Sequence, residues 1–256
     1  MKELRKDLLT VRIHETRTAM GKDAASDIAA CIHTLLSEKE TLNIIFAAAP
    51  SQNEVLAALV EDPTVPWERI NAFHMDEYIG LPVGAPQTFG SFLKEHIFAR
   101  VPFRTVNYID ASAENADAEC LRYAALLRDH PTDIVVMGIG ENGHIAFNDP
   151  PVADFKDPKA VKTVLLDPIC RNQQVNDGCF PTLSDVPTTA ITLTVPCLTA
   201  GAHLFCIVPA KTKAEAVRST LCGEISETCP ASVLRSHPSA VLYLDQDSSA
   251  LLPQAL

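Results

Sequence analysis

The sequence predicts an α/β fold in which a doubly wound, mostly parallel sheet is flanked by helices, as in a Rossmann-like open sandwich. Short apolar runs alternate with segments of helical length along the chain, which is typical of β-α-β units joined by right-handed crossovers. The run 133–137 is rich in β-branched residues, as expected for a central strand buried on both faces. With 256 residues and 47% hydrophobic content, the chain can bury a sizeable core, and 1–256 is expected to form a single domain.

The first half of the chain is expected to alternate between helices and strands. Apolar residues recur near helical spacing in the helical segments, and the strands are short apolar runs. Ser51 and Glu54 have the register of a capping box that opens the second helix. Leu121, Ala125 and Leu126 are expected on the inward face of the fourth helix. The predicted order is a helix over 14–37, a strand over 43–47, a helix over 55–60, a strand over 67–75, a helix over 89–98, a peripheral strand over 104–109 and a helix over 113–128.

The second half continues this alternation after the central strand. Residues 151–158 contain prolines and are expected to be irregular, and so is the glycine- and proline-rich segment 80–90, which is a candidate lid. The polar segment 171–178 is expected to be a surface loop or a short helix. The predicted elements are strands over 161–166, 190–195, 203–208 and 240–245, and a helix over 212–221.

Charge and cysteine content argue against several classes of function. The formal net charge of −11 disfavours nucleic acid or an anionic membrane as the main partner, because both select for basic surfaces. The eight cysteines form no Cys-x-x-Cys pair and mostly lie in apolar runs, so we expect reduced thiols in a cytoplasmic protein and no structural zinc. The sequence begins with a charged segment rather than a signal peptide, and no apolar run approaches the length of a membrane span.

A glycine-rich stretch directly follows the predicted central strand. It reads Gly-Ile-Gly-Glu-Asn-Gly-His and ends at His144, and the carboxylate of Asp149 follows five residues later. Ligands bind at the carboxyl ends of strands in open α/β sheets, and glycines let the backbone turn sharply and approach a ligand. If the strands before Ser51, Asp76 and Gly138 are neighbours, their side chains meet in one crevice.

The residue types in this crevice favour proton transfer on an anionic metabolite. Asp76 offers a carboxylate base, His144 an imidazole that donates or accepts a proton, and Asp149 a carboxylate that orients the ring. Lys213 and Arg171 are cations able to hold an anionic group. Together they fit proton abstraction next to a carbonyl in a phosphorylated metabolite. The sequence has no dinucleotide fingerprint, no Gly-x-Ser-x-Gly elbow and no metal-binding histidine spacing, so neither a cofactor nor a metal is expected.

Two motifs resemble those of the glucosamine-6-phosphate deaminase family. They are Phe-His-Met-Asp-Glu-Tyr-Ile-Gly-Leu-Pro over 73–82 and Gly-Ile-Gly-Glu-Asn-Gly-His-Ile-Ala-Phe-Asn-Asp-Pro over 138–150. Weaker matches over 87–92, 213–216 and 229–238 follow in the family's order, so the resemblance spans most of the chain. It implies a cofactor-free enzyme that opens the ring of glucosamine 6-phosphate, isomerises the aldose to a ketose and releases ammonia, leaving fructose 6-phosphate.

The resemblance also implies roles for single residues. Asp76 matches the general base that moves a proton from C2 to C1, and His144 matches the ring-opening catalyst. Asp149 stands where the family has a glutamate coupled to that histidine, and Lys213 matches the lysine that grips phosphate. Family members often form oligomers, so a homo-oligomer is one expected assembly. Ala160 lies near the place where regulated members carry an arginine, so we do not expect their allosteric regulation here.

The chain departs from the family pattern in the histidine and phosphate sites. Asn142 replaces an aspartate beside the histidine, and Asp149 is one methylene shorter than glutamate. Ala-Pro-Ser-Gln replaces a Gly-Ser-Thr-Pro phosphate loop, which leaves Ser51 and Gln52 as candidates for phosphate binding. The family's crevice arginine has no counterpart, and Arg171 is the predicted substitute. We therefore expect retained proton-transfer chemistry with an altered substrate fit.

Three alternative functions stay open at this point. A deaminase or isomerase of another amino-sugar phosphate, such as galactosamine 6-phosphate, would use the same residues. A 6-phosphogluconolactonase would share the fold, but residues 76–78 and 145–148 follow the deaminase pattern. A non-catalytic sugar-phosphate sensor would tolerate the altered phosphate loop, although the sequence shows no DNA-binding segment.

Overall fold

The computed structural model describes residues 1–82, 84–110 and 112–253. The strands of its main sheet are β1 (Lys2–Lys6), β2 (Leu9–Ile13), β3 (Leu42–Phe46), β4 (Ile70–His74), β6 (Thr105–Asn107), β7 (Ile134–Met137), β10 (His203–Val208) and β11 (Ala240–Leu244). Their order is β1-β2-β11-β10-β7-β3-β4-β6, and all of these neighbours pair in parallel except β1 with β2. β7 lies inside the sheet, as its apolar β-branched sequence predicts.

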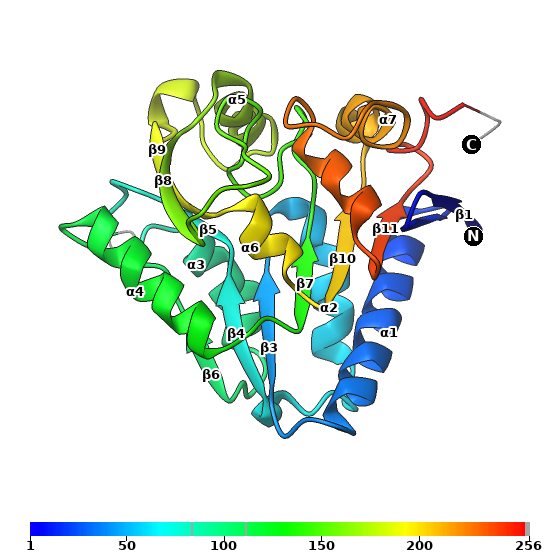
Figure 1. Cartoon of the computed structure of the whole chain (residues 1–256), viewed down its shortest axis with the longest axis horizontal. Coiled ribbons are helices and arrows are strands. Elements are labelled where there is room, and N and C mark those ends of the chain that lie inside the picture. Colours follow the sequence, from blue (N-terminus) through cyan, green and yellow to red (C-terminus); the bar gives the residue numbers. More distant parts are fainter. Residues whose placement is uncertain (83, 111, 254–256) are drawn as a thin grey trace.

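Helices cover both faces of the main sheet. They are α1 (Arg17–Leu36), α2 (Asn53–Glu61), α3 (Phe89–Leu93), α4 (Ala116–Asp129), α5 (Pro168–Asn176), α6 (Val195–Thr199) and α7 (Ala214–Cys222). Successive strand residues point to opposite layers: Ile44 and Phe46 pack in the core layer of α1 and α2, whereas Ile45 packs in the layer of α4, α6 and α7. Figure 1 shows α6 in front of the sheet and α2 behind it. This burial on two sides confirms the predicted α/β class.

A second, antiparallel sheet follows the carboxyl end of β4. It consists of β5 (Asp76–Tyr78), β8 (Val161–Leu165) and β9 (Thr189–Leu193), in the order β5-β9-β8 (Figure 1). The sequence predicted one strand over 67–75 leading into Asp76. Instead, Trp67–Arg69 is a 3-10 turn, and the chain changes sheets at Met75. The predicted base therefore belongs to a strand of the small sheet.

The structure corrects or narrows several local predictions. The β1–β2 hairpin was not predicted, since β1 is charged and mostly exposed and is stabilised by its pairing partner. Leu121 was expected on the inward face of α4 but is 74% exposed. Tyr123 and Leu127 are the α4 residues buried in the protein core instead. The segment 171–178 mostly belongs to α5, so of the two expected forms the short helix is correct.

The start of α2 also differs from the predicted capping box. A 3-10 turn over Pro50–Gln52 precedes α2, and no described side chain caps the helix. Glu54 instead accepts a hydrogen bond from Arg17 Nε, at 2.6 Å. A contact between α1 and α2 has therefore replaced the local cap.

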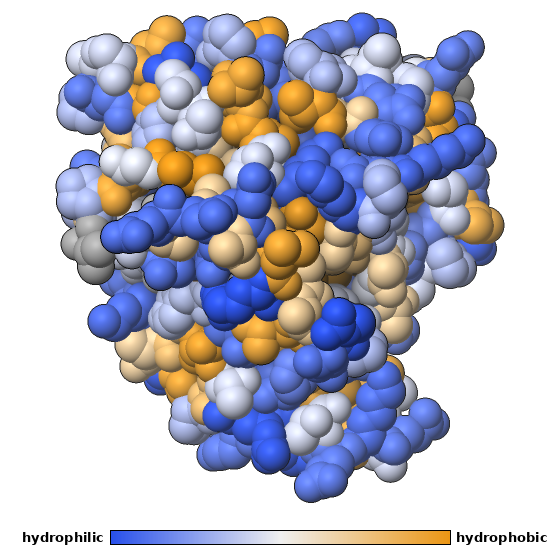
Figure 2. Space-filling model, turned by 60° about the vertical axis from the view of Figure 1, so that its left-hand side comes forward, coloured by the Kyte–Doolittle hydropathy of each residue, from blue (hydrophilic) through white to orange (hydrophobic). Residues whose placement is uncertain are grey.

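The surface is polar with dispersed apolar patches. Across the face in Figure 2, hydrophilic residues interrupt the hydrophobic ones. None of the helices in the described ranges combines the length and the apolar character needed to cross a bilayer.

Candidate active site

The carboxyl ends of the central strands surround a pocket with about 730 Å³ of empty space open to solvent. β3 pairs with both β4 and β7, so the strands that precede Ser51, Asp76 and Gly138 are neighbours, as the crevice hypothesis requires. Asp76 and His144 both line this pocket. Ligands bind at this edge of the sheet in open α/β folds.

Two polar neighbours hold the His144 ring through Nδ1. This atom lies 2.7 Å from Asn142 Oδ1 and 2.9 Å from Asp149 Oδ1, so we place its proton there, donated to both oxygens. Asn142 Nδ2 donates to Asp149 Oδ1 at 2.9 Å and closes the triangle. Asp149 therefore reaches the ring directly despite its shorter side chain. With Nδ1 protonated, Nε2 of His144 is the acceptor on a ring that lines the pocket.

Close packing fixes this histidine further. A Cβ atom on Gly140 would lie 2.0 Å from the His144 ring, so only glycine fits below it. Asp149 is 1% exposed. Burial raises the pKa of Asp149, but hydrogen bonds from His144 and Asn142 outweigh burial and leave this pKa lowered. Asp149 is therefore a carboxylate ready to stabilise a protonated imidazole.

Cys170 packs beside this triangle. Burial and the Asp149 carboxylate raise the pKa of its thiol well above the usual value. Across the part of the chain that the structure describes, His144, Asp149 and Cys170 form a group of potential metal ligands whose donor atoms lie within 4.8 Å of one another. The donor atoms of His144 and Asp149 already bind each other and Asn142, which accounts for the cluster by hydrogen bonding.

Asp76 opens β5 and is 6% exposed. Burial, and then the charge of Glu77, raise its pKa well above the ordinary value. Within the described ranges, its carboxylate accepts no hydrogen bond from the protein and remains available to a ligand. Glu77 has a different task, because its carboxylate accepts the N–H groups of Tyr78, Phe89 and Gly90. Of the candidate lid over 80–90, only Phe89 lines the pocket among the residues described.

The loop between His144 and Asp149 is fixed by the second sheet. Ala146 adopts a left-handed backbone with φ 49°, which is strained for a residue other than glycine. The neighbouring Phe147 N–H donates to Thr192 Oγ1 at 3.0 Å, and Asn148 Nδ2 donates to the Leu193 carbonyl at 2.8 Å. Hydrogen bonds to β9 thus hold the strained turn.

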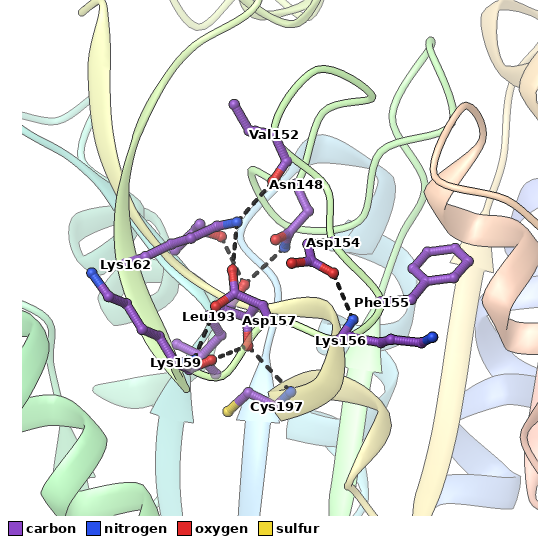
Figure 3. A network of polar contacts seen from close by, with 12 residues as sticks. Asn148, Val152, Asp154, Phe155, Lys156, Asp157, Lys159, Lys162, Leu193 and Cys197 are labelled. Carbon is purple, nitrogen blue, oxygen red and sulfur yellow. Dashed lines mark hydrogen bonds and ion pairs between the residues drawn. The ribbon is translucent and has the colours of Figure 1, made fainter.

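The chain after Asp149 is tied back to β8. Lys162 Nζ donates to the Val152 carbonyl at 2.7 Å and to Asp157 Oδ2 at 2.8 Å, and Figure 3 shows this contact beside the bond from Asn148 to Leu193. The segment 151–158 is irregular as predicted, and Lys162 holds it at Val152 and Asp157.

Lys213 brings a positive charge to the pocket. It is 5% exposed and lines the pocket, yet the described residues offer its ammonium no hydrogen-bond acceptor. It ends a 3-10 turn after Ala210, whose φ of 82° is held by hydrogen bonds from its N–H to Asp245. Burial lowers the pKa of Lys213, and Asp177 and Glu141 oppose this shift. A buried, unpaired ammonium facing a pocket favours an anionic ligand.

The structure gives Gln52 a bracing position. Its side chain is fully buried, and Nε2 donates to the carbonyls of Ile207, at 3.2 Å, and Met137, at 3.4 Å. These bonds join β10 to β7 and use the amide's donors, so the geometry does not support phosphate binding by this side chain. Ser51 Oγ accepts from Gln52 Nε2 at 3.0 Å, which leaves the serine hydroxyl proton for a ligand.

Arg171 lies away from the pocket, contrary to its predicted role. Its guanidinium donates to the carbonyls of Leu183 and Val186, both at 2.7 Å, and it is absent from the described pocket lining. It therefore holds the chain after α5 rather than an anion.

Sequence reasoning missed five polar residues that line the pocket, namely Arg17, Thr212, Gln173, Gln174 and Asp177. The last three share one face of α5, and their spacing over 173–177 was a usable signal because it matches one helical turn. Arg17 carried no such signal, since its position depends on how α1 docks on α2.

The sequence matches known proteins along most of its length. The family model of glucosamine-6-phosphate isomerases/6-phosphogluconolactonase matches residues 15–243. A glucosamine-6-phosphate deaminase of Listeria welshimeri is 32% identical over 238 residues, which cover 93% of this chain and 97% of that protein. A glucosamine-6-phosphate deaminase of Bacillus cytotoxicus is 34% identical over 187 residues, covering 73% and 70% of the two chains.

Solved structures show the same architecture. A monomeric glucosamine-6-phosphate deaminase matches with a TM-score of 0.84 at 28% identity, covering 94% of this chain and 99% of that one. A 6-phosphogluconolactonase of Thermotoga maritima matches with a TM-score of 0.74 at 21% identity, covering 93% and 99%, and this likeness shows the fold alone. The chain therefore belongs to the family of glucosamine-6-phosphate isomerases and 6-phosphogluconolactonases.

Proposed function

We propose that this chain is a glucosamine-6-phosphate deaminase. The observation that carries the proposal is the shared pocket, where the unbonded carboxylate of Asp76, the ring of His144 and the buried ammonium of Lys213 meet. A base, a proton shuttle and an anion site are what this reaction needs. The name of the relatives at 32% and 34% identity supports the same activity.

In the proposed mechanism, His144 opens the sugar ring. Nε2 accepts the proton of the C1 hydroxyl and returns a proton to the ring oxygen as the bond between C1 and that oxygen breaks. Asn142 and Asp149 hold the Nδ1 proton and so keep Nε2 directed at the substrate. Asp149 stabilises the imidazolium that forms between the two transfers.

Asp76 then moves a proton on carbon. It takes the proton from C2 of the open-chain aldehyde while the substrate's ammonium group passes a proton to the C1 oxygen, which gives an enaminol. Asp76 then returns its proton to C1, which leaves an iminium at C2. Water adds to C2 and ammonia leaves, giving fructose 6-phosphate. The raised pKa of Asp76 makes it a stronger base than an exposed carboxylate. Lys213 and the Ser51 hydroxyl bind the phosphate, and no step requires a cofactor.

A coupled assay for ammonia and fructose 6-phosphate tests the proposal. We expect turnover of glucosamine 6-phosphate, a loss of about 10²- to 10⁴-fold in Asp76→Asn, and retained substrate binding. Galactosamine 6-phosphate and 6-phosphogluconolactone serve as competing substrates. Lactone hydrolysis removes no proton from carbon, so efficient lactone turnover that survives Asp76→Asn would identify a lactonase. Binding without turnover would identify a sensor.

Location and assembly are further parts of the proposal. All eight cysteines are free, which supports a reducing, cytoplasmic compartment. A homo-oligomer stays a prediction from the family resemblance, and light scattering on the purified chain measures it directly.

A further inference from the structure

The pocket contains a second cation that the family resemblance did not supply. Arg17 lines the pocket together with Lys213. The described lining contains no other lysine or arginine. We propose that Arg17 supplies the second phosphate-binding cation, in place of the family's missing crevice arginine. This inference deepens the proposed function, because it names a residue that selects a phosphorylated substrate.

Arg17 is held at the edge of the pocket by its neighbours. It is the first residue of α1, directly after Thr16, whose Oγ1 caps the helix by accepting the Ala19 N–H at 3.1 Å. Its Nε donates to Glu54 Oε1 at 2.6 Å, and Nη2 donates to the Pro50 carbonyl. Among the described residues, Nη1 has no such partner, and the side chain is 35% exposed. The guanidinium is therefore fixed on one side and free to bind an anion on the other.

The docking of α1 on α2 brings Arg17 to this position. Gly21 lies one turn after Arg17, and a Cβ atom at Gly21 would lie 2.4 Å from Glu54 Cβ. The two helices thus approach more closely than any larger residue at position 21 permits. This approach places the carboxylate of Glu54 and the carbonyl of Pro50 within reach of Arg17. The same contact accounts for the loss of the predicted capping box at α2.

The α5 side of the pocket lining carries an acidic residue. The chain reads Asn176-Asp177 in the region where the family resemblance implies an arginine, and Asp177 lines the pocket. Both Asp177 and Glu141 act on Lys213 electrostatically. A phosphate is therefore repelled from α5 and attracted toward α1, between Lys213 and Arg17 and beside the Ser51 hydroxyl.

Titration of the full chain with inorganic phosphate, followed by calorimetry, tests this assignment. Arg17→Gln keeps the polar side chain and removes the charge, and we expect phosphate affinity to fall by about tenfold or more. Asp177→Asn removes repulsion and should tighten binding. Arg128→Gln is the matched control, because Arg128 is 75% exposed and pairs with its neighbour Asp129. Unchanged affinity in Arg17→Gln, or no phosphate binding by the wild type, overturns the inference.

Glu54→Gln separates anion binding from helix docking. It weakens the ion pair but leaves the cation, so phosphate affinity should be kept or increased. If Glu54→Gln loses as much affinity as Arg17→Gln, the role of Arg17 is structural and the inference falls. With glucosamine 6-phosphate, Arg17→Gln should raise KM more than it lowers kcat. A wild type without turnover would refute the proposed function, while the phosphate titration would still decide the role of Arg17.

Discussion

Asp76 lies directly opposite Thr192 in the antiparallel pairing of β5 with β9, and Thr192 Oγ1 also accepts the Phe147 N–H at 3.0 Å. One residue of β9 therefore contacts both the strand of the proposed base and the loop between His144 and Asp149. The relative position of the carboxylate and the imidazole is set by this shared neighbour, because neither side chain contacts the other in the described hydrogen bonds.

Thr192→Val should disturb both stability and catalysis. Valine keeps the shape but leaves the buried Phe147 N–H without an acceptor, which should cost about 1–3 kcal/mol of unfolding free energy. We expect kcat to fall more than KM rises, because the loop shifts relative to Asp76. Urea unfolding and steady-state kinetics measure the two effects. Thr163→Val, at an exposed position of β8, is the control. Normal kcat in a destabilised Thr192→Val protein would show that β9 does not align the site.

Asn142→Asp should move the acid side of the pH–rate profile to higher pH. The change replaces the donor to Asp149 by a second carboxylate beside His144 Nδ1. Two carboxylates favour the imidazolium, whereas ring opening needs neutral Nε2, so a higher pH is needed to free it. Asn172→Asp adds the same charge on the exposed surface of α5 and should leave the profile in place. An identical profile for both variants would argue against a role for position 142.

Asp149→Asn should destabilise the protein at pH 7 and much less at low pH. Burial raises the pKa of Asp149, but its hydrogen bonds lower it overall, below 3.8. The stability from this carboxylate is thus present above about pH 3.8 and is lost as pH falls through the folded pKa. Urea unfolding at pH 7 and pH 3 should show a difference of about 1–3 kcal/mol that shrinks on acidification. Asp247→Asn, at an exposed position, is the control. A pH-independent loss would mean that packing, not charge, is responsible.

Glu77→Gln should loosen the start of α3 and remove a pH dependence of stability. The Glu77 carboxylate accepts three backbone N–H groups, and burial raises its pKa from 4.5 to about 7. The folded protein binds a proton at Glu77 more tightly than the unfolded chain does. The contribution of Glu77 to stability is therefore full below pH 4.5 and declines as pH rises to about 7. A glutamine replaces one carboxylate oxygen by an N–H donor, so at least one of the Phe89 and Gly90 amides loses its acceptor and should exchange hydrogen faster.

Hydrogen exchange of these two amides and urea unfolding between pH 4.5 and 7 are the measurements. Glu95→Gln, on an exposed position of the next turn, should change neither. Wild-type exchange rates at Phe89 and Gly90 in Glu77→Gln would show that backbone packing alone holds this segment.

The central strands and the Asp76 and His144 motifs could be predicted because their sequences are locally decisive. The apolar runs of β3, β7 and β10 fit a strand covered on both faces, and the glycines at 138–143 allow the tight turn beneath the histidine ring. Placing these motifs in a parallel sheet was enough to expect that Asp76 and His144 share a crevice.

The remaining features depend on contacts that sequence patterns do not reveal. The exposed, charged strand β1 forms because β2 pairs with it on one side and with β11 on the other. Arg17 lies at the pocket edge because Gly21 leaves space for Glu54 to pack closely against α1. Arg171 lies away from the pocket because it donates hydrogen bonds to carbonyls after α5. Each outcome depends on a partner outside the segment itself.

In the proposed mechanism, Thr192 positions the reacting end of the substrate through the small sheet, while Lys213 and Arg17 bind the phosphate from elements packed on the large sheet. The residues proposed for proton transfer on carbon and those proposed for phosphate binding therefore depend on different sheets. Substitutions among the residues that bind the distal group can therefore change the preferred metabolite while the strand that carries the proposed base keeps its place.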